Sequence, residues 1–293
     1  MVVICGPGSE EIGSVVASIL EVESSVVEHR VFTDGEDYLR LTTDVTGRDV
    51  VLVHSMGPPQ DRRLVQLLLI LDALREGGAG SVELVAPYLA YARQDRGQLP
   101  GEAVSAFTVM KLLRYLGVSR LVTVNVHNPD VFKGAGFELT DFSAIPLLAD
   151  YLRGEGLEEC FSLSLGNKPI DIRHVEEAAA VLGGSYARLR TFRDPSTGEV
   201  RLDEPGFTVR GERAAIFDDV ITSGGTHLQV VELLQGMGVE EVHLACVHSL
   251  LSEERLRDVL DATDSFTCTD TVPSRCSRVG VAPLIAGALA ERG

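Results

Sequence analysis

Basic residues are scarce in this 293-residue chain. Its 26 lysines and arginines are outnumbered by 43 aspartates and glutamates, and the formal net charge is −17 at pH 7. A protein this acidic does not bind nucleic acid or an anionic membrane surface through a general electrostatic field. Only three of the basic residues are lysines, namely Lys111, Lys133 and Lys168. Any anionic substrate must therefore be held by local positive groups or by metal ions.

Paired cysteines and long apolar runs are also missing. The five cysteines are Cys5, Cys160, Cys246, Cys268 and Cys276. Because their number is odd and no pair has CxxC spacing, we expect buried thiols in a reducing cytoplasm, with a Cys268–Cys276 disulfide as the less favoured alternative. No apolar run reaches the roughly 18 residues of a membrane helix, and the N-terminus lacks the pattern of a signal peptide. These absences predict a cytoplasmic protein with no membrane partner.

Apolar segments of strand and helix length alternate along the chain. With 45% hydrophobic and 24% charged residues, the composition is globular and suits one large or two ordinary domains. Strands are predicted at 2–5, 26–32, 50–54, 82–86, 120–126, 161–165, 187–192, 214–217, 241–247 and 265–269. Helices are predicted at 10–20, 62–75, 103–116, 146–153, 175–182, 227–237, 253–261 and 283–290, with a polar loop or hairpin over 193–207. The alternation favours an α/β fold of two units that meet near residues 140–147.

The most informative stretch is AAIFDDVITSGGT, residues 214–226. Residues 214–217 form a short apolar run typical of a buried parallel strand, and Asp218 and Asp219 stand where that strand is expected to end. Small residues and then the predicted helix at 227–237 follow. Open α/β sheets bind ligands at this place, beyond the carboxyl ends of their strands.

The residue types of this stretch suit a sugar phosphate. Gly224 and Gly225 let the backbone turn sharply and come close to a ligand. Free amides at a helix start attract an anion, and the hydroxyls of Thr222, Ser223 and Thr226 add donors. The two preceding carboxylates can accept hydrogen bonds from the vicinal hydroxyls of a ribose. The alternative is a plain acidic strand end with a flexible turn, which the flanking strand and helix make less favourable.

Three further stretches stand in the order known from one family. They are FTDGED (residues 32–37), APYLAYARQDRGQLPGEAVSA (86–106) and LVTVNVH (121–127). Together with GFELTDFSAIPLLADYL (136–152), FTCTDTVP (266–273) and the loop described above, they resemble ribose-phosphate pyrophosphokinase, or phosphoribosyl pyrophosphate (PRPP) synthetase, in its archaeal-like form. The likeness covers most of the chain and is weakest over residues 160–205.

The resemblance implies two tandem domains of the type I phosphoribosyltransferase class, each a mainly parallel sheet flanked by helices. The first, over residues 1–143, would hold ATP, and the second, over 144–293, would carry the PRPP loop. The last helix either stays with the second domain or packs back on the first. The family transfers a diphosphoryl group from MgATP to the 1-hydroxyl of ribose 5-phosphate. This implies Mg²⁺ as cofactor, ATP and ribose 5-phosphate as partners, and a homo-oligomer of two or more copies.

The matching positions imply roles in ATP binding. Phe32, Asp34 and Glu36 would line the adenosine pocket, because a ring face stacks on adenine and carboxylates accept from its amine or the ribose. A structural phenylalanine beside an acidic turn is the alternative. Guanidinium forks suit phosphate oxygens. Four polar residues would hold the nucleotide and its phosphates: Arg93, Gln94, Asp95 and Arg96.

The remaining implied roles concern ribose phosphate and the transfer itself. His127 ends a predicted strand and would contact a phosphate or help to hold Mg²⁺. Asp218 and Asp219 would bind the ribose hydroxyls, and either could assist deprotonation of the attacking hydroxyl. Arg193 would act in catalysis from a mobile loop. The 5-phosphate would lie in the loop of Thr222, Ser223, Gly224, Gly225 and Thr226.

Three positions depart from the family's pattern. Asn125 stands two residues before His127, where the family usually has an Asp. Asn167 and Lys168 lie in a segment that replaces a Pro-Asp-x-Gly turn whose Asp touches metal or ribose. Thr191 occupies the place of a Lys that supports the transferring phosphate.

The loss of that Lys bears most on activity. Arg193 keeps the place of the Arg that accompanies it, and Arg190 or Lys168 is a candidate substitute. A guanidinium is not equivalent to a compact ammonium at a transferring phosphate. The favoured interpretation is an active synthetase with an altered site. A binding or regulatory subunit without turnover is the second. A base phosphoribosyltransferase is the third, and it explains the DD…TSGGT loop but not PYLAYARQDR or the two-unit length.

Overall fold

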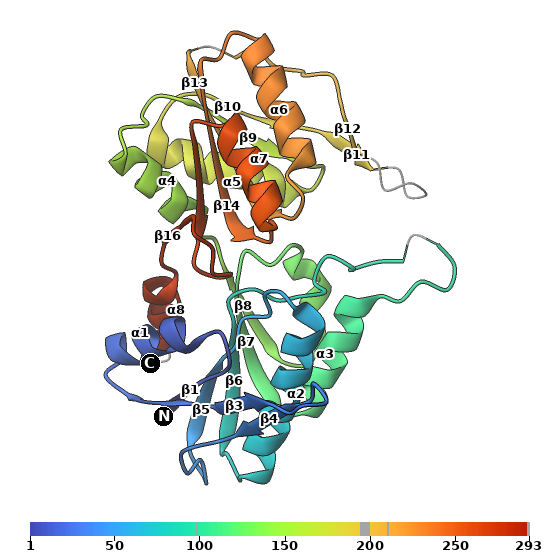
Figure 1. Cartoon of the computed structure of the whole chain (residues 1–293), viewed down its shortest axis with the longest axis vertical. Helices are drawn as coiled ribbons and strands as arrows, with labels where there is room; N and C mark the ends of the chain where they lie inside the picture. Colours follow the sequence, from blue (N-terminus) through green and yellow to red (C-terminus); the bar gives the residue numbers. More distant parts are fainter. Residues whose placement is uncertain (98, 194–199, 210, 292–293) are drawn as a thin grey trace. The chain divides into compact units, whose positions relative to one another are not determined.

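The computed structural model describes residues 1–97, 99–193, 200–209 and 211–291, which form two compact units (Figure 1). The first unit comprises Met1–Phe142 together with Gly280–Gly293, and the second comprises Ser143–Val279. Each unit is built on one six-stranded sheet. The chain therefore leaves the first unit once and returns to it with its last helix, α8 (Ala282–Ala290).

The sheet of the first unit has the strand order β2-β1-β5-β6-β7-β8, and all its pairings are parallel. Its strands are β1 (Val2–Cys5), β2 (Glu23–Val26), β5 (Asp49–Val53), β6 (Ser81–Ala86), β7 (Val118–Val124) and β8 (Glu138–Phe142). Its helices are α1 (Glu10–Ile19), α2 (Gln60–Glu76), α3 (Ser105–Tyr115) and α8, with a 3-10 turn η1 (Pro129–Phe132). All of β1 and residues 50–53 of β5 are buried, as expected for apolar strands covered on both faces.

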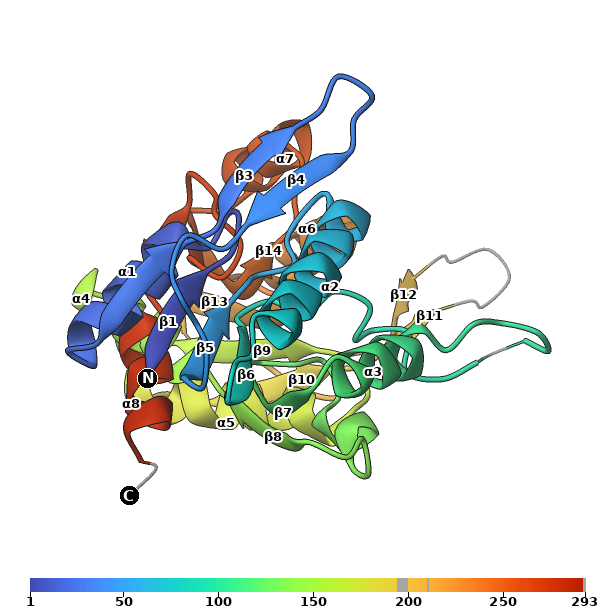
Figure 2. The ribbon, with the colours of Figure 1, turned by 90° about the horizontal axis from the view of Figure 1, so that it is seen from below.

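Helix α8 packs beside α1, so both ends of the described chain lie in this unit (Figure 2). Ile285 and Leu289 of α8 are buried. Arg120 of β7 donates from Nη2 to the carbonyl of Ala288 at 3.5 Å and lies 3.7 Å from the carboxylate of Glu83. The last helix is therefore attached to the first sheet by its buried apolar side chains and by Arg120, which contacts both α8 and Glu83 of β6.

The sheet of the second unit has the order β10-β9-β13-β14-β15-β16 and is again entirely parallel. Its strands are β9 (Phe161–Leu165), β10 (Tyr186–Leu189), β13 (Arg213–Ile221), β14 (Glu241–Ser249), β15 (Ser265–Thr269) and β16 (Ser277–Val279). Its helices are α4 (Ile145–Gly154), α5 (Pro169–Leu182), α6 (Gly225–Gly236) and α7 (Glu253–Ala262). Ile216 at the centre of β13 belongs to a fully buried cluster with Val230 and Leu234 of α6, which fixes α6 against the sheet.

Two antiparallel hairpins complete the fold. The first unit carries β3 (Glu28–Val31) and β4 (Asp37–Arg40), and the second carries β11 (Thr191–Arg193) and β12 (Val200–Leu202). The predicted loop or hairpin over 193–207 is thus a hairpin where it is described, while residues 194–199 lie outside the described part. Both hairpins are separate from the six-stranded sheets.

Several predicted strand limits are wrong. The strand expected over 26–32 breaks at Val27: β2 lies in the main sheet, and β3 lies in the hairpin. The strand expected over 187–192 likewise divides into β10 and β11. The strand expected over 120–126 ends at Val124, and the one expected over 214–217 continues to Ile221. In each case the partner strand decides where pairing stops: β14 pairs with β13 as far as Ile221, and β8 pairs with β7 as far as Val124.

All five cysteines are buried free thiols, so the prediction of buried, unpaired thiols is confirmed and the Cys268–Cys276 disulfide is wrong. Burial raises the pKa of Cys5 and of Cys268 to about 11, which keeps both thiols protonated. Within the described residues, no helix has the length and apolar character required to cross a membrane.

Gly6 provides a test of packing in the first unit. It lies against the fully buried ring of His54, whose Nε2 donates to the carbonyl of Arg63 at 2.9 Å. A β-carbon at residue 6 would come 2.3 Å from His54 Nδ1. We predict that Gly6→Ala lowers the free energy of unfolding by about 1–3 kcal/mol, as overpacking does, measured by urea denaturation.

The matched control is Gly154→Ala at the end of α4, where an added β-carbon meets nothing within 4 Å. This variant should be neutral or slightly stabilising. Equal stability of Gly6→Ala and the wild type would show that the ring and loop shift without cost.

Candidate active site

The turn of hairpin β3–β4 carries the predicted adenosine-pocket residues. The amide of Phe32 donates to the carbonyl of Glu36 at 2.8 Å, and the carboxylate of Asp34 accepts from the amide of Glu36 at 3.1 Å. The Phe32 ring meets Tyr38 edge-on with centroids 6.0 Å apart, and the residue is 47% exposed. The turn thus brings these three predicted residues together and presents an open aromatic ring beside two exposed carboxylates.

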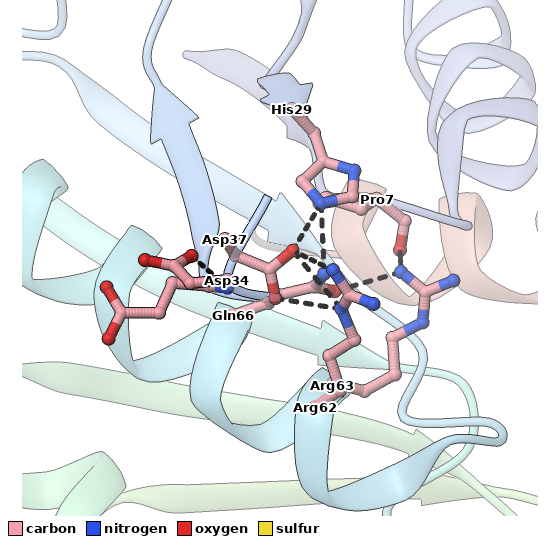
Figure 3. A network of polar contacts seen from close by, with 8 residues as sticks. Pro7, His29, Asp34, Asp37, Arg62, Arg63 and Gln66 are labelled. Atoms are coloured by element: carbon pink, nitrogen blue, oxygen red, sulfur yellow. Dashed lines mark hydrogen bonds and ion pairs between the residues drawn. The ribbon is translucent and has the colours of Figure 1, made fainter. Parts of the chain in front are cut away.

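Asp37 ties this hairpin to helix α2 (Figure 3). Arg62 donates from Nε to Asp37 Oδ2 at 2.9 Å and from Nη2 to Oδ1 at 2.7 Å. His29 of β3 contacts Oδ1 at 2.6 Å, and Gln66 of α2 contacts His29 at 3.3 Å. The Arg62 guanidinium, followed by His29 and Gln66, holds the pKa of the Asp37 carboxyl well below its usual range. The carboxylate is therefore charged, nearly buried and held by charge-assisted bonds.

The segment between β6 and α3 carries the predicted phosphate-binding residues. The hydroxyl of Ser105 donates to Gln94 Oε1 at 2.5 Å, and the amide of Ala106 donates to the Gln94 carbonyl at 3.2 Å. These bonds fasten the segment to the start of α3. Arg93 and Arg96 are exposed on either side of Gln94. Gln94 thus anchors the segment, while the flanking guanidinium groups face solvent.

His127 lies in the turn that follows β7, and this turn contacts the same segment. The side-chain amide of Asn128 donates to Asp95 Oδ2 at 2.5 Å. Asn125 adopts φ = 44°, a left-handed conformation that Asn and Asp tolerate better than other residues. Asp141 of β8 accepts from the amide after Asn125 at 2.9 Å and fixes the turn. The structure therefore brings the neighbour of His127 to Asp95, and Asn125 keeps the backbone that an Asp would adopt.

The first turn of α2 joins these two parts of the first unit. The hydroxyl of Tyr91, in the segment of the phosphate-binding residues, donates to the carboxylate of Asp61. The next residue, Arg62, makes the paired bonds to Asp37. One helical turn thus holds both the β3–β4 hairpin and the segment that carries Arg93 and its neighbours.

The strand–loop–helix stretch in the second unit has the geometry of an anion site. Strand β13 ends at Ile221, and Gly224 adopts φ = +73° immediately before α6. A β-carbon there would come 2.9 Å from Val259 Cγ2, so glycine is required for close packing as well as for the turn. No side chain caps α6, and Thr222, Ser223 and Gly225 are exposed. Uncapped amides at a helix start, beside exposed hydroxyls, suit a phosphate.

Both aspartates lie inside β13 rather than beyond its end, so that expectation is wrong. Asp219 is 8% exposed, and its amide donates to Asp218 Oδ1 at 2.8 Å. Asp218 Oδ2 lies 2.8 Å from Nε2 of His227 in the first turn of α6. Burial raises the pKa of Asp218, and its bond to His227 opposes this shift. No sequence pattern indicated the pair of Asp218 and His227, because the two residues are nine positions apart on different elements.

Two of the three departures from the family pattern, at Asn167–Lys168 and Thr191, lie together near the start of α5. The side-chain amide of Asn167 donates to the carbonyl of Thr191. Asp171, which the sequence did not single out, accepts from the amide of Lys168 at 2.6 Å. Burial, followed by the charges of Asp219 and Asp218, raises the pKa of the Asp171 carboxyl. A carboxylate therefore lies near the two aspartates of β13 from a neighbouring helix. The side chain of Arg193 lies outside the described part of the structure.

The predicted Mg²⁺ has no ready-made protein cage. Among the described residues, no three His, Cys, Asp or Glu side chains are grouped so that they could hold a metal ion. Mg²⁺ commonly keeps several waters and binds through substrate phosphates with only one or two protein ligands. The described side chains are therefore compatible with an ion bound mainly through nucleotide phosphates.

Two parallel α/β units, one carrying a strand–acidic pair–loop–helix site, define a protein of the phosphoribosyltransferase class. Family models extend this: residues 1–117 match the N-terminal domain of ribose phosphate pyrophosphokinase, and residues 179–283 match the phosphoribosyl transferase domain. The chain is 35% identical over 266 residues to the ribose-phosphate pyrophosphokinase of Saccharolobus solfataricus. This match covers 88% of this chain and 89% of the relative. It is 34% identical over 290 residues to that of Methanopyrus kandleri, across 99% of this chain and 98% of the relative.

A solved structure gives the same result. The crystal structure of phosphoribosylpyrophosphate synthetase from Mycobacterium smegmatis matches 100% of this chain and 99% of its own chain, with a TM-score of 0.86 and 27% sequence identity. The chain belongs to the ribose-phosphate pyrophosphokinase family. The predicted family and the predicted fold class are both confirmed.

The pair of Arg62 and Asp37 gives a test of how the hairpin is held. We predict that Arg62→Gln lowers the free energy of unfolding by about 1–3 kcal/mol, because a nearly buried carboxylate loses its paired donors. Amide hydrogen exchange over residues 28–40 should accelerate in this variant. The control is Arg75→Gln at the other end of α2, where an exposed pair with Asp72 is lost and about 0.5 kcal/mol or less is expected. Unchanged exchange in Arg62→Gln would show that the hairpin is held by other contacts.

Proposed function

We propose that this protein is a ribose-phosphate diphosphokinase, which transfers diphosphate from MgATP to ribose 5-phosphate and yields PRPP and AMP. The observation that carries the proposal is the start of α6, which no side chain caps. Gly224 forms a left-handed turn there, shortly after the two aspartates of β13 in the sequence. The proposal is supported by the family to which the chain belongs. Relatives that are named for this activity match the chain over 89% and 98% of their own lengths.

In the proposed complex, the 5-phosphate lies at the start of α6. Amides of the first turn and the hydroxyls of Thr222, Ser223 and Thr226 donate to its oxygens. Asp219, inside β13 and close to its end at Ile221, accepts from ribose hydroxyls and orients the sugar. The site needs little local positive charge, because backbone donors replace it.

The nucleotide is assigned to the first unit. Phe32 offers a ring face to adenine, and Asp34 and Glu36 accept from the adenine amine or the ribose. Arg93 and Arg96 provide mobile guanidinium groups for phosphate oxygens, and Gln94 and Asp95 hold their segment in place. Val31, which is 49% exposed, offers apolar area for a second copy of the chain, and we propose a homo-oligomer on that basis. From the family to which the chain belongs, we also propose a cytoplasmic location.

The proposed reaction is an in-line displacement at the β-phosphorus of ATP. The 1-hydroxyl oxygen forms the new bond, the bond to the α-phosphate bridging oxygen breaks, and AMP leaves. Positioning and charge neutralisation supply most of the acceleration in such transfers. Mg²⁺, when bound, neutralises phosphate charge, and His127 would contact it or a phosphate. Asp219 orients the hydroxyl, and Arg193 would face the transferring group.

The departures at Asn125, Asn167 and Thr191 keep a binding or regulatory subunit as the second interpretation. The relatives that cover the whole chain are named as enzymes, which favours turnover. A base phosphoribosyltransferase is disfavoured, because residues 1–117 match a domain described for the pyrophosphokinase.

The activity is tested by incubating purified protein with ATP, Mg²⁺ and ribose 5-phosphate and measuring AMP. We expect AMP release that depends on the sugar phosphate. Asp219→Ala should abolish ribose 5-phosphate binding in calorimetry while ATP binding stays unchanged, because the two sites use different residues. Ligand binding without AMP release would select the non-catalytic interpretation, and an unchanged affinity of Asp219→Ala for ribose 5-phosphate would reject the loop assignment.

Thr191 provides a second test within the proposed activity. We predict that Thr191→Lys raises kcat by about tenfold or more, because it restores a compact ammonium beside the transferring phosphate. KM for either substrate should change little. Thr191→Met, which is similar in reach but uncharged, is the control. Equal rates for the two variants would mean that another cation already serves this position.

A further inference from the structure

His227 is a buried histidine directly behind the loop of α6. It is 6% exposed and stands in the first helical turn, three residues after the left-handed Gly224. Its Nε2 lies 2.8 Å from Asp218 Oδ2. No role is assigned to this residue by the family resemblance or by the proposed contacts to the sugar phosphate.

Asp218 is held on both sides by groups of the protein. Oδ1 accepts the amide of Asp219 at 2.8 Å, and Oδ2 accepts from His227. The carboxylate therefore bridges the first turn of α6 to the backbone of the neighbouring aspartate. A chain of two hydrogen bonds connects His227 to the residue proposed to orient the ribose.

The surroundings of Asp218 make the charge of its carboxyl group depend on the hydrogen bond from His227. Three further titratable groups face it: Asp219 on the same strand, Asp171 on α5 and Cys246 on β14. Burial, together with the negative charge of Asp219, favours the protonated carboxyl of Asp218. The hydrogen bond from His227 acts in the opposite direction and keeps the carboxylate form available. No described lysine or arginine is among the groups that shift Asp218.

We propose that His227 is a positioning residue of the ribose 5-phosphate site. By donating to Asp218 it fixes the carboxylate that holds the Asp219 amide, and so sets the geometry between the end of β13 and the loop of α6. This inference rests on the proposed function and deepens it, since it adds a residue that acts on the sugar phosphate only through the two aspartates, Asp218 and Asp219.

The test compares His227→Leu with His227→Gln, which keeps a side-chain donor. For His227→Leu we expect the KM for ribose 5-phosphate to rise by about tenfold, as for the loss of a hydrogen bond to a charged group, with the KM for ATP within about twofold of the wild type. Loss of the histidine raises the pKa of Asp218 further, so Asp218 takes up its proton at a higher pH. The acid limb of the pH profile of kcat/KM should therefore move to higher pH in His227→Leu. His227→Gln should recover most of the affinity.

His243→Gln is the matched control, because that histidine lies at the start of β14, bonded to Ser265, and should leave all these quantities unchanged. Wild-type kinetics and an unmoved acid limb in His227→Leu would overturn the proposal. So would equal losses for both substrates together with a lowered melting temperature, which indicate a purely structural role. If His227→Leu does not fold, His227→Phe replaces it as the variant without a donor: a raised KM for ribose 5-phosphate with a shifted acid limb supports the proposal, and wild-type values reject it.

A second readout separates this inference from the proposed function. In nuclear magnetic resonance, the Asp219 amide reports on Asp218 without any ligand, and its pH-dependent shift should have a higher midpoint in His227→Gln than in the wild type. Identical midpoints would reject the coupling. A wild type that neither binds ribose 5-phosphate nor releases AMP would reject the proposed function, while this titration would still test the bridge.

Discussion

A protein with a net charge of −17 repels phosphates overall. It binds one only where local hydrogen-bond donors stabilise the anion by more than this repulsion costs. The start of α6 meets this condition with backbone amides, which carry no counter-charge and need no lysine. Gly224 makes this possible, because its left-handed turn and its contact with Val259 leave no room for a β-carbon. The parallel sheet then matters chiefly because it delivers a buried strand end and a helix start to the same edge.

The same constraint explains how the carboxylates are arranged. The Asp37 side chain is 6% exposed and is matched by Arg62 and His29, whereas the Asp218 side chain is 18% exposed and is matched by His227 and a backbone amide. A buried carboxylate without such partners is costly in an already acidic chain. These pairs also hold elements together: the first joins the β3–β4 hairpin to α2, and the second joins β13 to α6. Compensation of charge and positioning of the site are therefore achieved by the same bonds.

Sequence patterns predicted those strands, helices and loops whose formation depends on residues close together in the chain. Short segments in which apolar and small polar residues mix located the inner strands β9 and β15 to the residue, and the glycine–hydroxyl loop predicted the start of α6 within two residues. The edge strands β8 and β16 were missed, because β8 is polar and β16 has only three residues. Residues such as His227, Arg62 and Asp171 escaped notice for another reason. Their partners come from other elements, and only the folded topology brings them together.

The departures from the family's pattern are best understood through charge balance. Asn125 retains the left-handed backbone that an Asp would adopt but removes a negative charge from the turn beside His127. Asn167 and Lys168 remove a second carboxylate from the start of α5, while Thr191 removes an ammonium. In the second unit, one negative charge is thus lost at Asn167 and one positive charge at Thr191, so these two changes have opposite effects on a bound phosphate. The substitutions thus oppose one another electrostatically, and the geometric role of the ammonium, rather than its charge alone, is what an active enzyme of this sequence must replace.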